Sequence, residues 1–164
     1  DGLLLTLAFG RRKTKKDCRF MVTNPEMKGL QGWFLKRLGC FPINQDSPSL
    51  SSLRYALKLI VNQNQLVIFP EGKINKHGKK LPLKQGLFRL AQLAKKKGTI
   101  VNVVPIGIAY DKVVPRFRGE VALCIEKPLN INNFSDLSIE EFNTSLNKRI
   151  NNAELKALKQ VGRL

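Results

Sequence analysis

One run of large apolar residues, Leu66-Val67-Ile68-Phe69, most restricts how this chain can fold. The run is short and ends at Pro70, so it predicts a buried strand. Segments with helical spacing of apolar residues stand on both sides of it. The segment before it opens at Ser47-Pro48 and carries one apolar helical face, made of Leu50, Leu53, Leu57, Ile60 and Val61. A buried strand between amphipathic helices predicts an α/β layered fold.

The rest of the chain continues this alternation. We expect strands at 19–23, 41–43, 100–110 and 120–125. Pro42 confines its segment to an edge strand or an irregular turn, and Pro105 and Gly107 interrupt the third of these strands. We expect helices at 2–9, from Asn24-Pro25-Glu26 to Leu38, at 84–97 and from Ser138 onward. In the 84–97 helix the predicted inward residues are Leu87, Leu90, Ala91 and Ala94.

These elements predict a single layered domain over residues 1–164. Its mixed sheet is expected to be mostly buried and flanked by helices. A polar helical extension is expected over residues 135–164, because Ser138-Ile139-Glu140-Glu141 has the spacing of a capping box.

The charge balance restricts the class of partner. There are 29 Lys and Arg against 12 Asp and Glu, which gives a net charge of +17. Such a domain attracts polyanions, namely nucleic acid, an anionic membrane face, or phosphorylated and acidic substrates. Apolar residues make up 43% of the chain, so there is enough material for a core. With three widely spaced cysteines and His77 as the only histidine, we expect neither a disulfide framework nor a metal site.

The residues after the apolar run are candidates for function. The sequence there reads Phe69-Pro70-Glu71-Gly72. In open α/β sheets, ligands collect at the carboxyl ends of strands. Glu71 can accept a hydrogen bond from a substrate hydroxyl or hold a cation, and Gly72 permits close approach or a positive φ. The same four residues also suit an ordinary surface turn, and on their own they do not decide between the two.

Three segments in a fixed order add to this pattern: Phe69-Pro70-Glu71-Gly72, then residues 79–86 (Lys-Lys-Leu-Pro-Leu-Lys-Gln-Gly), then Val104-Pro105-Ile106. Together they resemble the glycerolipid acyltransferase family, which includes the 1-acylglycerol-3-phosphate acyltransferases. The family's four blocks are Asn-His-x-x-x-x-Asp, Gly-x-x-Phe-Ile-x-Arg, Phe-Pro-Glu-Gly-Thr-Arg-Ser and a Val-Pro-Ile strand. The resemblance covers residues 1–128, and the third block is its most specific part.

The resemblance implies a catalytic role for Asp1. Asp1 is followed by Gly2-Leu3-Leu4-Leu5 and matches the last position of the first block. The histidine of that block would stand five residues upstream, before the chain begins. The chain therefore resembles a family member cut within its first block, and we expect it to turn over poorly. In the family this pair would supply a base, with the aspartate holding the histidine in the right tautomer.

The resemblance also implies an acceptor site. Its residues would be Gln45, Phe69, Pro70, Glu71, Gly72, Lys73 and Lys84, with Gly39, Ile43 and Pro105 as structural residues near it. Three features depart from the family pattern. Pro42 stands where the family has an aromatic or aliphatic residue, and Gln45 stands where it has Arg. Lys73-Ile74-Asn75 replaces Thr-Arg-Ser, and Thr23 lies near a position where many members carry Lys. In the family the Arg and Lys of those positions hold the acceptor's phosphate, so these changes argue against lysophosphatidic acid as the acceptor. Lys73, Lys76 and Lys84 could compensate as point charges, but Lys cannot reproduce bidentate Arg geometry.

The implied reaction moves a fatty acyl group from acyl-CoA or acyl-carrier protein to a hydroxyl of a lysophospholipid-type or other glycerolipid. It needs no metal and no cofactor beyond that thioester co-substrate. The implied partners are the acyl thioester donor, the lipid acceptor and an anionic membrane surface. The implied location is peripheral, on the cytoplasmic face of a membrane.

One predicted helix can be interpreted in two ways. It carries an apolar group with basic neighbours, made of Leu30, Trp33, Phe34, Leu35 and Leu38 with Lys28, Lys36 and Arg37. A Trp-containing amphipathic helix with basic flanks suits the interface of an anionic leaflet. The same spacing also suits a stripe that packs against the core, with a solvated basic side.

Nucleic-acid binding is the competing function. The charge and the sequence pI of 10.2 support it. We disfavour it because the aromatic residues lie within apolar runs, and because no RNA-recognition aromatic motif or zinc-finger spacing is present. A non-catalytic lipid-binding remnant is a third possibility.

Overall fold

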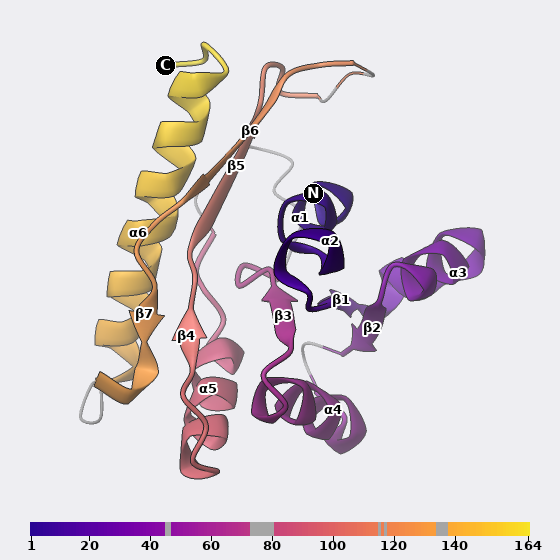
Figure 1. Cartoon of the computed structure of the whole chain (residues 1–164), viewed down its shortest axis with the longest axis vertical. Helices are drawn as coiled ribbons and strands as arrows, with labels where there is room; N and C mark the ends of the chain where they lie inside the picture. The colour runs from indigo at the N-terminus through magenta and orange to yellow at the C-terminus, as the bar shows by residue number, and fades with distance from the viewer. Residues whose placement is uncertain (45–46, 73–80, 115, 117, 134–137) are drawn as a thin grey trace. The chain divides into compact units, whose positions relative to one another are not determined.

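The computed structural model describes residues 1–44, 47–72, 81–114, 116, 118–133 and 138–164. By its internal contacts the chain divides into two compact units, Asp1–Thr99 and Ile100–Leu164. Each unit is an assembly of helices on strands (Figure 1). Among the described residues, no helix has the length and apolar character that crossing a bilayer requires.

The first unit is built on a parallel sheet of three strands in the order β2-β1-β3. The strands are β1 (Cys18–Thr23), β2 (Cys40–Ile43) and β3 (Gln65–Ile68). Pro42 stands in an outer strand, opposite Val22, so the prediction that it marks an edge is confirmed. Because all three strands run the same way, their carboxyl ends meet at one edge of the sheet.

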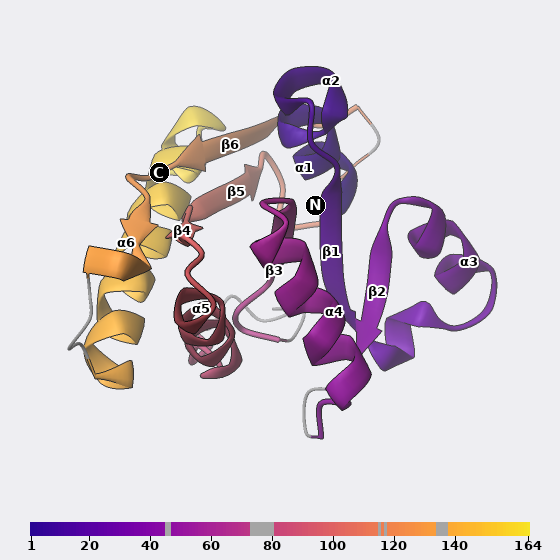
Figure 2. The same cartoon turned by 60° about the horizontal axis from the view of Figure 1, so that its bottom comes forward.

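Helices cover both faces of this sheet. On one face, α1 (Gly2–Phe9) meets the buried Phe20 of β1. Phe41 is the register partner of Met21, so its side chain points to the other face. There it makes an edge-to-face contact with Tyr55 of α4 (Leu50–Val61), at 4.9 Å between ring centroids. Figure 2 shows α1 and α4 on opposite sides of the strands.

The helix expected from Asn24 is divided in two. A 3₁₀ turn, η1 (Asn24–Met27), comes first, and α3 (Gly29–Arg37) follows it. Lys28 between them is extended, and Gly29 has a φ of +59° that favours glycine. The turn folds back on α3 so closely that a Cβ on Gly32 would lie 2.0 Å from the Met27 carbonyl oxygen. The Asn-Pro-Glu pattern does indicate a helical start, but the two glycines allow a sharp break that the pattern does not reveal.

The next two helices form close to where they were expected, and the predicted inward residues are confirmed more fully in the second helix than in the first. The cap of α4 is Ser49, whose Oγ accepts from the Ser52 amide at 3.2 Å, so the helix begins after Ser47-Pro48. Ala56 and Leu59 are its buried residues, Leu53, Leu57 and Ile60 are half-buried, and Leu50 is 69% exposed, so the buried face is turned from the centre of the predicted stripe. The predicted stripe was built from the large apolar residues of this helix and left Ala56 out. In α5 (Gly86–Lys96), Phe88 is buried together with Leu90, Ala91 and Ala94, and Leu87 is half-buried.

The second unit contains two antiparallel pairs instead of one long strand pairing. The pairs are β4 (Asn102–Val103) with β7 (Leu129–Asn130), and β5 (Ile106–Tyr110) with β6 (Val121–Ile125). Pro105 separates β4 from β5, as predicted, and a short 3₁₀ turn, η2 (Ile131–Asn133), follows β7. Gly107 does not interrupt its strand, because it lies inside β5 opposite Cys124. The described strands form three separate sheets, one parallel and two antiparallel, and β3 is half-buried.

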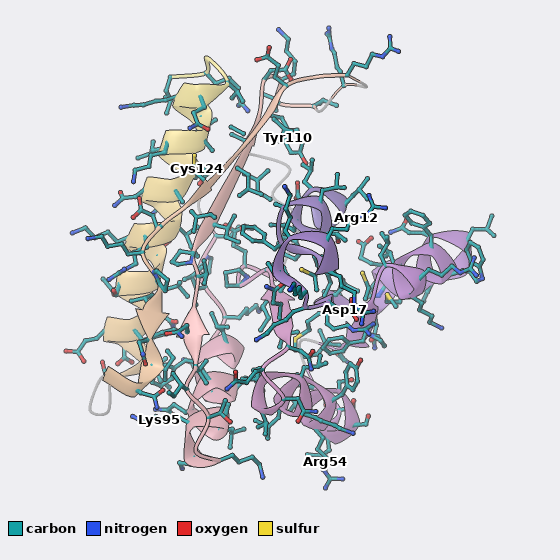
Figure 3. All side chains as sticks on the ribbon, viewed as in Figure 1. Arg12, Asp17, Arg54, Lys95, Tyr110 and Cys124 are labelled. Atoms are coloured by element: carbon teal, nitrogen blue, oxygen red, sulfur yellow. The ribbon has the colours of Figure 1, made fainter. Side chains whose placement is uncertain are left out.

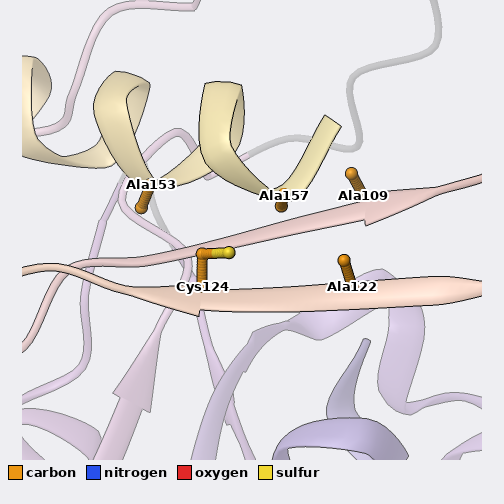
Figure 4. Close-up of a cluster of buried hydrophobic side chains, with 5 residues drawn as sticks. All are labelled: Ala109, Ala122, Cys124, Ala153 and Ala157. Atoms are coloured by element: carbon orange, nitrogen blue, oxygen red, sulfur yellow. The ribbon is translucent and has the colours of Figure 1, made fainter. Parts of the chain in front are cut away.

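The long helix α6 (Ile139–Gln160) packs on β5 and β6. The contact is made by small side chains, Ala109 and Ala122 with Cys124 from the strands and Ala153 and Ala157 from the helix (Figure 4). Gly107 shares this close approach, because a Cβ there would lie 2.2 Å from the Glu154 amide nitrogen. The helix expected to be polar is therefore amphipathic, with Phe142 and Leu146 also buried.

Polar contacts also fasten α6 to the strands. Lys156 makes a salt bridge with Glu126, just beyond β6, and its hydrogen bond lowers the pKa of the Glu126 carboxyl. Because the folded-state pKa is the lower one, this stabilisation is present above the unfolded carboxyl's pKa and is lost as the pH falls through the folded value. The Arg149 guanidinium donates to the Lys127 carbonyl at 2.7 Å, and that of Arg163 donates to the Tyr110 carbonyl at 3.1 Å.

The predicted capping box at the start of α6 is confirmed and can be tested. Ser138 Oγ accepts from the Glu141 amide at 3.2 Å, and the Glu141 carboxylate accepts from the Ser138 amide at 2.9 Å. We expect Ser138→Ala to lower the free energy of unfolding by about 1 kcal/mol, because an amide at the helix start loses its partner. The measurement is urea unfolding followed by circular dichroism. Ser145→Ala, within the same helix, is the control, and equal stability of the two variants would contradict the assigned cap.

Candidate active site

The Phe69–Gly72 segment forms a tight turn directly after β3. The Gly72 amide donates to the Phe69 carbonyl at 3.1 Å, which closes a four-residue turn with Pro70 in its second position. Gly72 has a φ of +69°, a conformation that favours glycine. The segment therefore has a defined shape in which Glu71, half-buried, lies at the carboxyl edge of the sheet.

Lys84 lies beside this turn through its backbone. Its amide donates to the Pro70 carbonyl at 2.8 Å, and its side chain is exposed. The sequence suggested Lys84 for its charge alone, and the hydrogen bond supplies the reason why it is near Glu71. Lys73 lies outside the described residues, as do the lysines at 76, 79 and 80 and the only histidine, His77.

Asp1 precedes the first helix on the same sheet. It occupies the N-cap position of α1, and its carbonyl accepts from the Leu5 amide at 3.0 Å. A Cβ on Gly2 would lie 3.9 Å from the Phe20 ring, so the start of α1 lies over the middle of β1. The end of α1 leads through α2 (Arg11–Thr14) to the start of β1, and Asp1 stands at the other end of α1 (Figure 2).

The remaining predicted site residues fall in three places. Ile43 ends β2 opposite Thr23, at the carboxyl edge, and Gln45 lies outside the described residues. Gly39 lies at the other end of β2, where its carbonyl accepts from the Phe20 amide at 3.2 Å. Its φ is +85°, and a Cβ added there would lie 3.0 Å from the Cys18 carbonyl oxygen, which explains why a glycine is needed. Pro105 belongs to the second unit, where its carbonyl accepts from the Glu126 amide at 3.0 Å.

Gly2 makes a contact between α1 and the sheet that the sequence pattern did not single out. A Cβ at Gly2 would meet the Phe20 ring at 3.9 Å, an ordinary van der Waals distance, so the start of α1 packs over this ring. The available signal was a glycine next to the aspartate, and a single glycine in a helical segment carries little information.

The described residues offer no metal site and carry a large excess of positive charge. Nowhere within those ranges do three or more His, Cys, Asp or Glu side chains come together in a way that could hold a metal ion. Cys18, Cys40 and Cys124 are free thiols, and burial raises the pKa of Cys18 and Cys40. Asp17 makes ion pairs with Arg19 at 3.8 Å and Arg11 at 4.0 Å. Other cations, such as Arg12 and Arg54, extend outward from the ribbon (Figure 3).

Comparison with known proteins shows the family of the chain. The family model described as Acyltransferase matches residues 1–109. The chain is 30% identical over 129 residues to a 1-acyl-sn-glycerol-3-phosphate acyltransferase of Bacillus subtilis, covering 76% of this chain and 62% of that protein. It is 24% identical over 120 residues to the enzyme of the same name from Streptococcus pneumoniae, covering 71% of this chain and 42% of that protein.

A solved structure has the same fold. The crystal structure of the 1-acyl-sn-glycerophosphate acyltransferase PlsC from Thermotoga maritima matches with a TM-score of 0.59 at 20% sequence identity, over 85% of this chain and 56% of that one. The expected α/β fold, with a parallel sheet flanked by helices, is thereby confirmed. The chain belongs to the acyltransferase family, and it spans less than two thirds of the length of these relatives.

Proposed function

We propose that this protein transfers a fatty acyl group from a thioester to a hydroxyl of a lysophospholipid-type or other glycerolipid acceptor. The observation that carries the proposal is the Phe69–Gly72 turn at the carboxyl edge of a parallel sheet, with the start of α1, next to Asp1, lying over β1 of the same sheet. Ligands of open α/β sheets collect at this edge. Family membership supports the type of reaction, since the named relatives are acyltransferases.

The proposed chemistry needs a base and a way to hold developing charge. The base takes the proton of the acceptor hydroxyl while its oxygen forms a bond to the thioester carbonyl carbon. The carbon–sulfur bond then breaks, and the base returns its proton to the sulfur, which leaves as a thiol. In the family pattern the base is the histidine five positions before Asp1. The Asp1 carboxylate would accept a hydrogen bond from the other ring nitrogen of this histidine and so keep the imidazole in the tautomer that accepts a proton.

The proposed role of Glu71 is to position the acceptor. Its carboxylate would accept a hydrogen bond from an acceptor hydroxyl, with the Gly72 backbone leaving room for the glycerol group. Lys84, whose amide is joined to the Pro70 carbonyl, would supply a positive charge next to that turn. Gln45 and Ile74 stand where the family has Arg, so we propose an acceptor that does not depend on a bidentate contact to phosphate.

The donor is proposed to be acyl-CoA or acyl-carrier protein. Both carry negative charge, in phosphates or in acidic side chains, and a net charge of +17 attracts either one. A lipid acceptor implies work at a membrane, and we propose a peripheral location on its cytoplasmic face. The alternative of nucleic-acid binding rests on charge alone, and a gel shift followed through a salt titration measures it.

An acyl-transfer assay tests the proposal. Two proteins are compared, this 164-residue chain and a version extended upstream through the histidine of the first block. Each is supplied with radiolabelled acyl-CoA or acyl-carrier protein and a panel of lysophospholipids. We expect product from the extended protein and far slower turnover from the shorter chain. Absence of product from the extended protein with every donor and acceptor, or equal rates from both proteins, would contradict the proposal.

The role of Glu71 has a separate test in the extended protein. We expect Glu71→Gln to raise KM for the acceptor by about tenfold, because hydrogen bonds to a charged group contribute about 1.5–3 kcal/mol and the amide forms a weaker one. The KM for the thioester should change little. Glu154→Gln, on an exposed part of α6, is the matched control. A Glu71→Gln protein with an unchanged KM for the acceptor would remove this residue from the site.

A further inference from the structure

Helix α3 presents large apolar side chains to solvent. Leu30 is 89% exposed, Trp33 59% and Phe34 53%. They stand at positions i, i+3 and i+4, so they form one stripe on the helix. The two other apolar residues of this segment, Leu35 and Leu38, are half-buried. The stripe of Leu30, Trp33 and Phe34 therefore does not belong to the core of the unit, which answers the question that the sequence left open.

Positive charge surrounds the stripe. Lys28 and Lys36 are exposed at the two ends of α3, and the Arg37 guanidinium lies 4.6 Å from the centre of the Trp33 ring. No Asp or Glu occurs between Glu26 and Asp46 in the sequence. The stripe is thus an apolar surface with cations at its rim, and its helix carries no acidic residue. Such a surface is complementary to a lipid bilayer, which has an apolar interior and anionic headgroups.

The joint between η1 and α3 directs the stripe outward. Gly32, on the opposite side of the helix from the exposed residues, is buried against the backbone at Met27. The Gln31 amide donates to the Glu26 carboxylate at 2.6 Å and ties the helix to the turn. With its glycine side held against η1, α3 turns Leu30, Trp33 and Phe34 away from its support. The turn itself follows Thr23, the last residue of β1, at the carboxyl edge that also bears Glu71.

We propose that the α3 stripe is the surface with which this protein docks on an anionic lipid bilayer. Leu30, Trp33 and Phe34 enter the boundary between headgroups and acyl chains, while Lys28, Lys36 and Arg37 contact lipid phosphates. The proposal deepens the proposed function and rests on it, because it names the surface through which a lipid-acylating enzyme meets its substrate. Docking through α3 keeps the carboxyl edge of the sheet close to the membrane, since η1 connects the two directly.

Trp33 is the only tryptophan of the chain, so its fluorescence reports on this surface alone. The 164-residue chain is mixed with vesicles of phosphatidylserine and phosphatidylcholine, without acyl donor. We expect the emission to shift to shorter wavelength, and brominated lipids to quench it at a depth of about 5–10 Å below the headgroup boundary. Vesicles of pure phosphatidylcholine should bind much more weakly. Vesicle binding with unchanged Trp33 emission, or no binding to anionic vesicles, would overturn the proposal.

Paired variants separate this surface from general charge. One variant combines Leu30→Ser with Phe34→Ser, and a second combines Lys28→Gln, Lys36→Gln and Arg37→Gln. We expect each variant to weaken vesicle binding at least about tenfold. The matched controls are Leu50→Ser with Leu93→Ser, two exposed leucines on α4 and α5, and Lys95→Gln with Lys96→Gln and Lys97→Gln. Circular dichroism verifies that each variant is folded. If variants and controls lost vesicle binding equally, the protein would be held to vesicles by charge or apolar groups spread over its surface. That result would overturn the assignment to α3.

The outcome is independent of the proposed chemistry. In the extended protein, the α3 variants should keep their rate on an acceptor dispersed in detergent and lose it on an acceptor embedded in anionic vesicles. Loss on both would mean that α3 acts in catalysis or folding and not in docking. A shift of Trp33 emission with single-stranded nucleic acid, in the absence of a shift with vesicles, would assign the surface to a different polyanion.

Discussion

Asp1→Asn, in a protein extended so that it carries the family's histidine five positions before Asp1, is expected to lower kcat for acyl transfer by about 10³–10⁴-fold. The amide has the size of the carboxylate, so the start of α1 over Phe20 should be preserved. It presents N–H donors to the imidazole, however, and so favours the tautomer that cannot take the proton from the acceptor. Losses of this size are typical when an orienting aspartate of a histidine base becomes asparagine. Steady-state kinetics with saturating thioester and acceptor measures the effect.

Asp17→Asn is the matched control for this substitution. Asp17 lies just before β1 and pairs with Arg19 and Arg11 at the surface, away from the proposed chemistry. Exposed ion pairs contribute little to stability, so this variant should keep nearly the full rate. If Asp1→Asn retained the rate of Asp17→Asn, the catalytic assignment of Asp1 would be wrong, whatever the role of Glu71.

Gly107→Ala is expected to destabilise the second unit by about 3 kcal/mol, near the upper end of what overpacking costs. A methyl group at this position would lie 2.2 Å from the Glu154 amide nitrogen and 2.3 Å from the Ala153 carbonyl carbon. Both neighbours are backbone atoms of α6, so no side-chain rotation relieves the clash. The helix must move away from β5, and the buried layer around Ala153 and Ala157 loses its packing. Thermal unfolding followed by circular dichroism measures the effect.

Gly86→Ala provides the control for a glycine that is not in contact with other groups. Gly86 is the first residue of α5, its φ is not positive, and a Cβ there meets nothing within 4 Å. We expect the unfolding free energy to change by less than about 1 kcal/mol, with any change toward higher stability, because Ala favours helices. A Gly107→Ala protein as stable as the Gly86→Ala protein would mean that α6 does not pack against β5 as described.

Elements that depend on local pattern could be predicted from the sequence. The apolar run ending at Pro70 did form a strand, Pro42 did mark an edge, and Ser138 with Glu141 did cap a helix. In each case a few adjacent residues contain the physical cause. The order of strands depends on contacts between distant segments, and the break at Lys28-Gly29 depends on the backbone freedom of glycine; apolar periodicity carries no record of either. The phase of α4 was missed for the same reason, because Ala56 is buried by what surrounds it.

The candidate site was predictable to a similar extent. The turn after β3 was identified from its four residues together with a family resemblance. The position of Lys84 beside Pro70 and that of Gly2 on Phe20 are tertiary contacts, which no local pattern of residues encodes. Exposure was the least predictable property, since the spacing of Leu30, Trp33 and Phe34 suits a buried face and an exposed face equally well.

The layer of small side chains beneath α6 makes Cys124 a natural probe of breathing in the second unit. Its thiol lies between the hairpin and the helix, where Sγ is 3.4 Å from the Gln160 side-chain oxygen. A thiol reagent has no room to enter while the alanines are in contact. The rate at which Cys124 is labelled therefore reports how often the hairpin and the helix separate, in the same way as exchange of a protected amide.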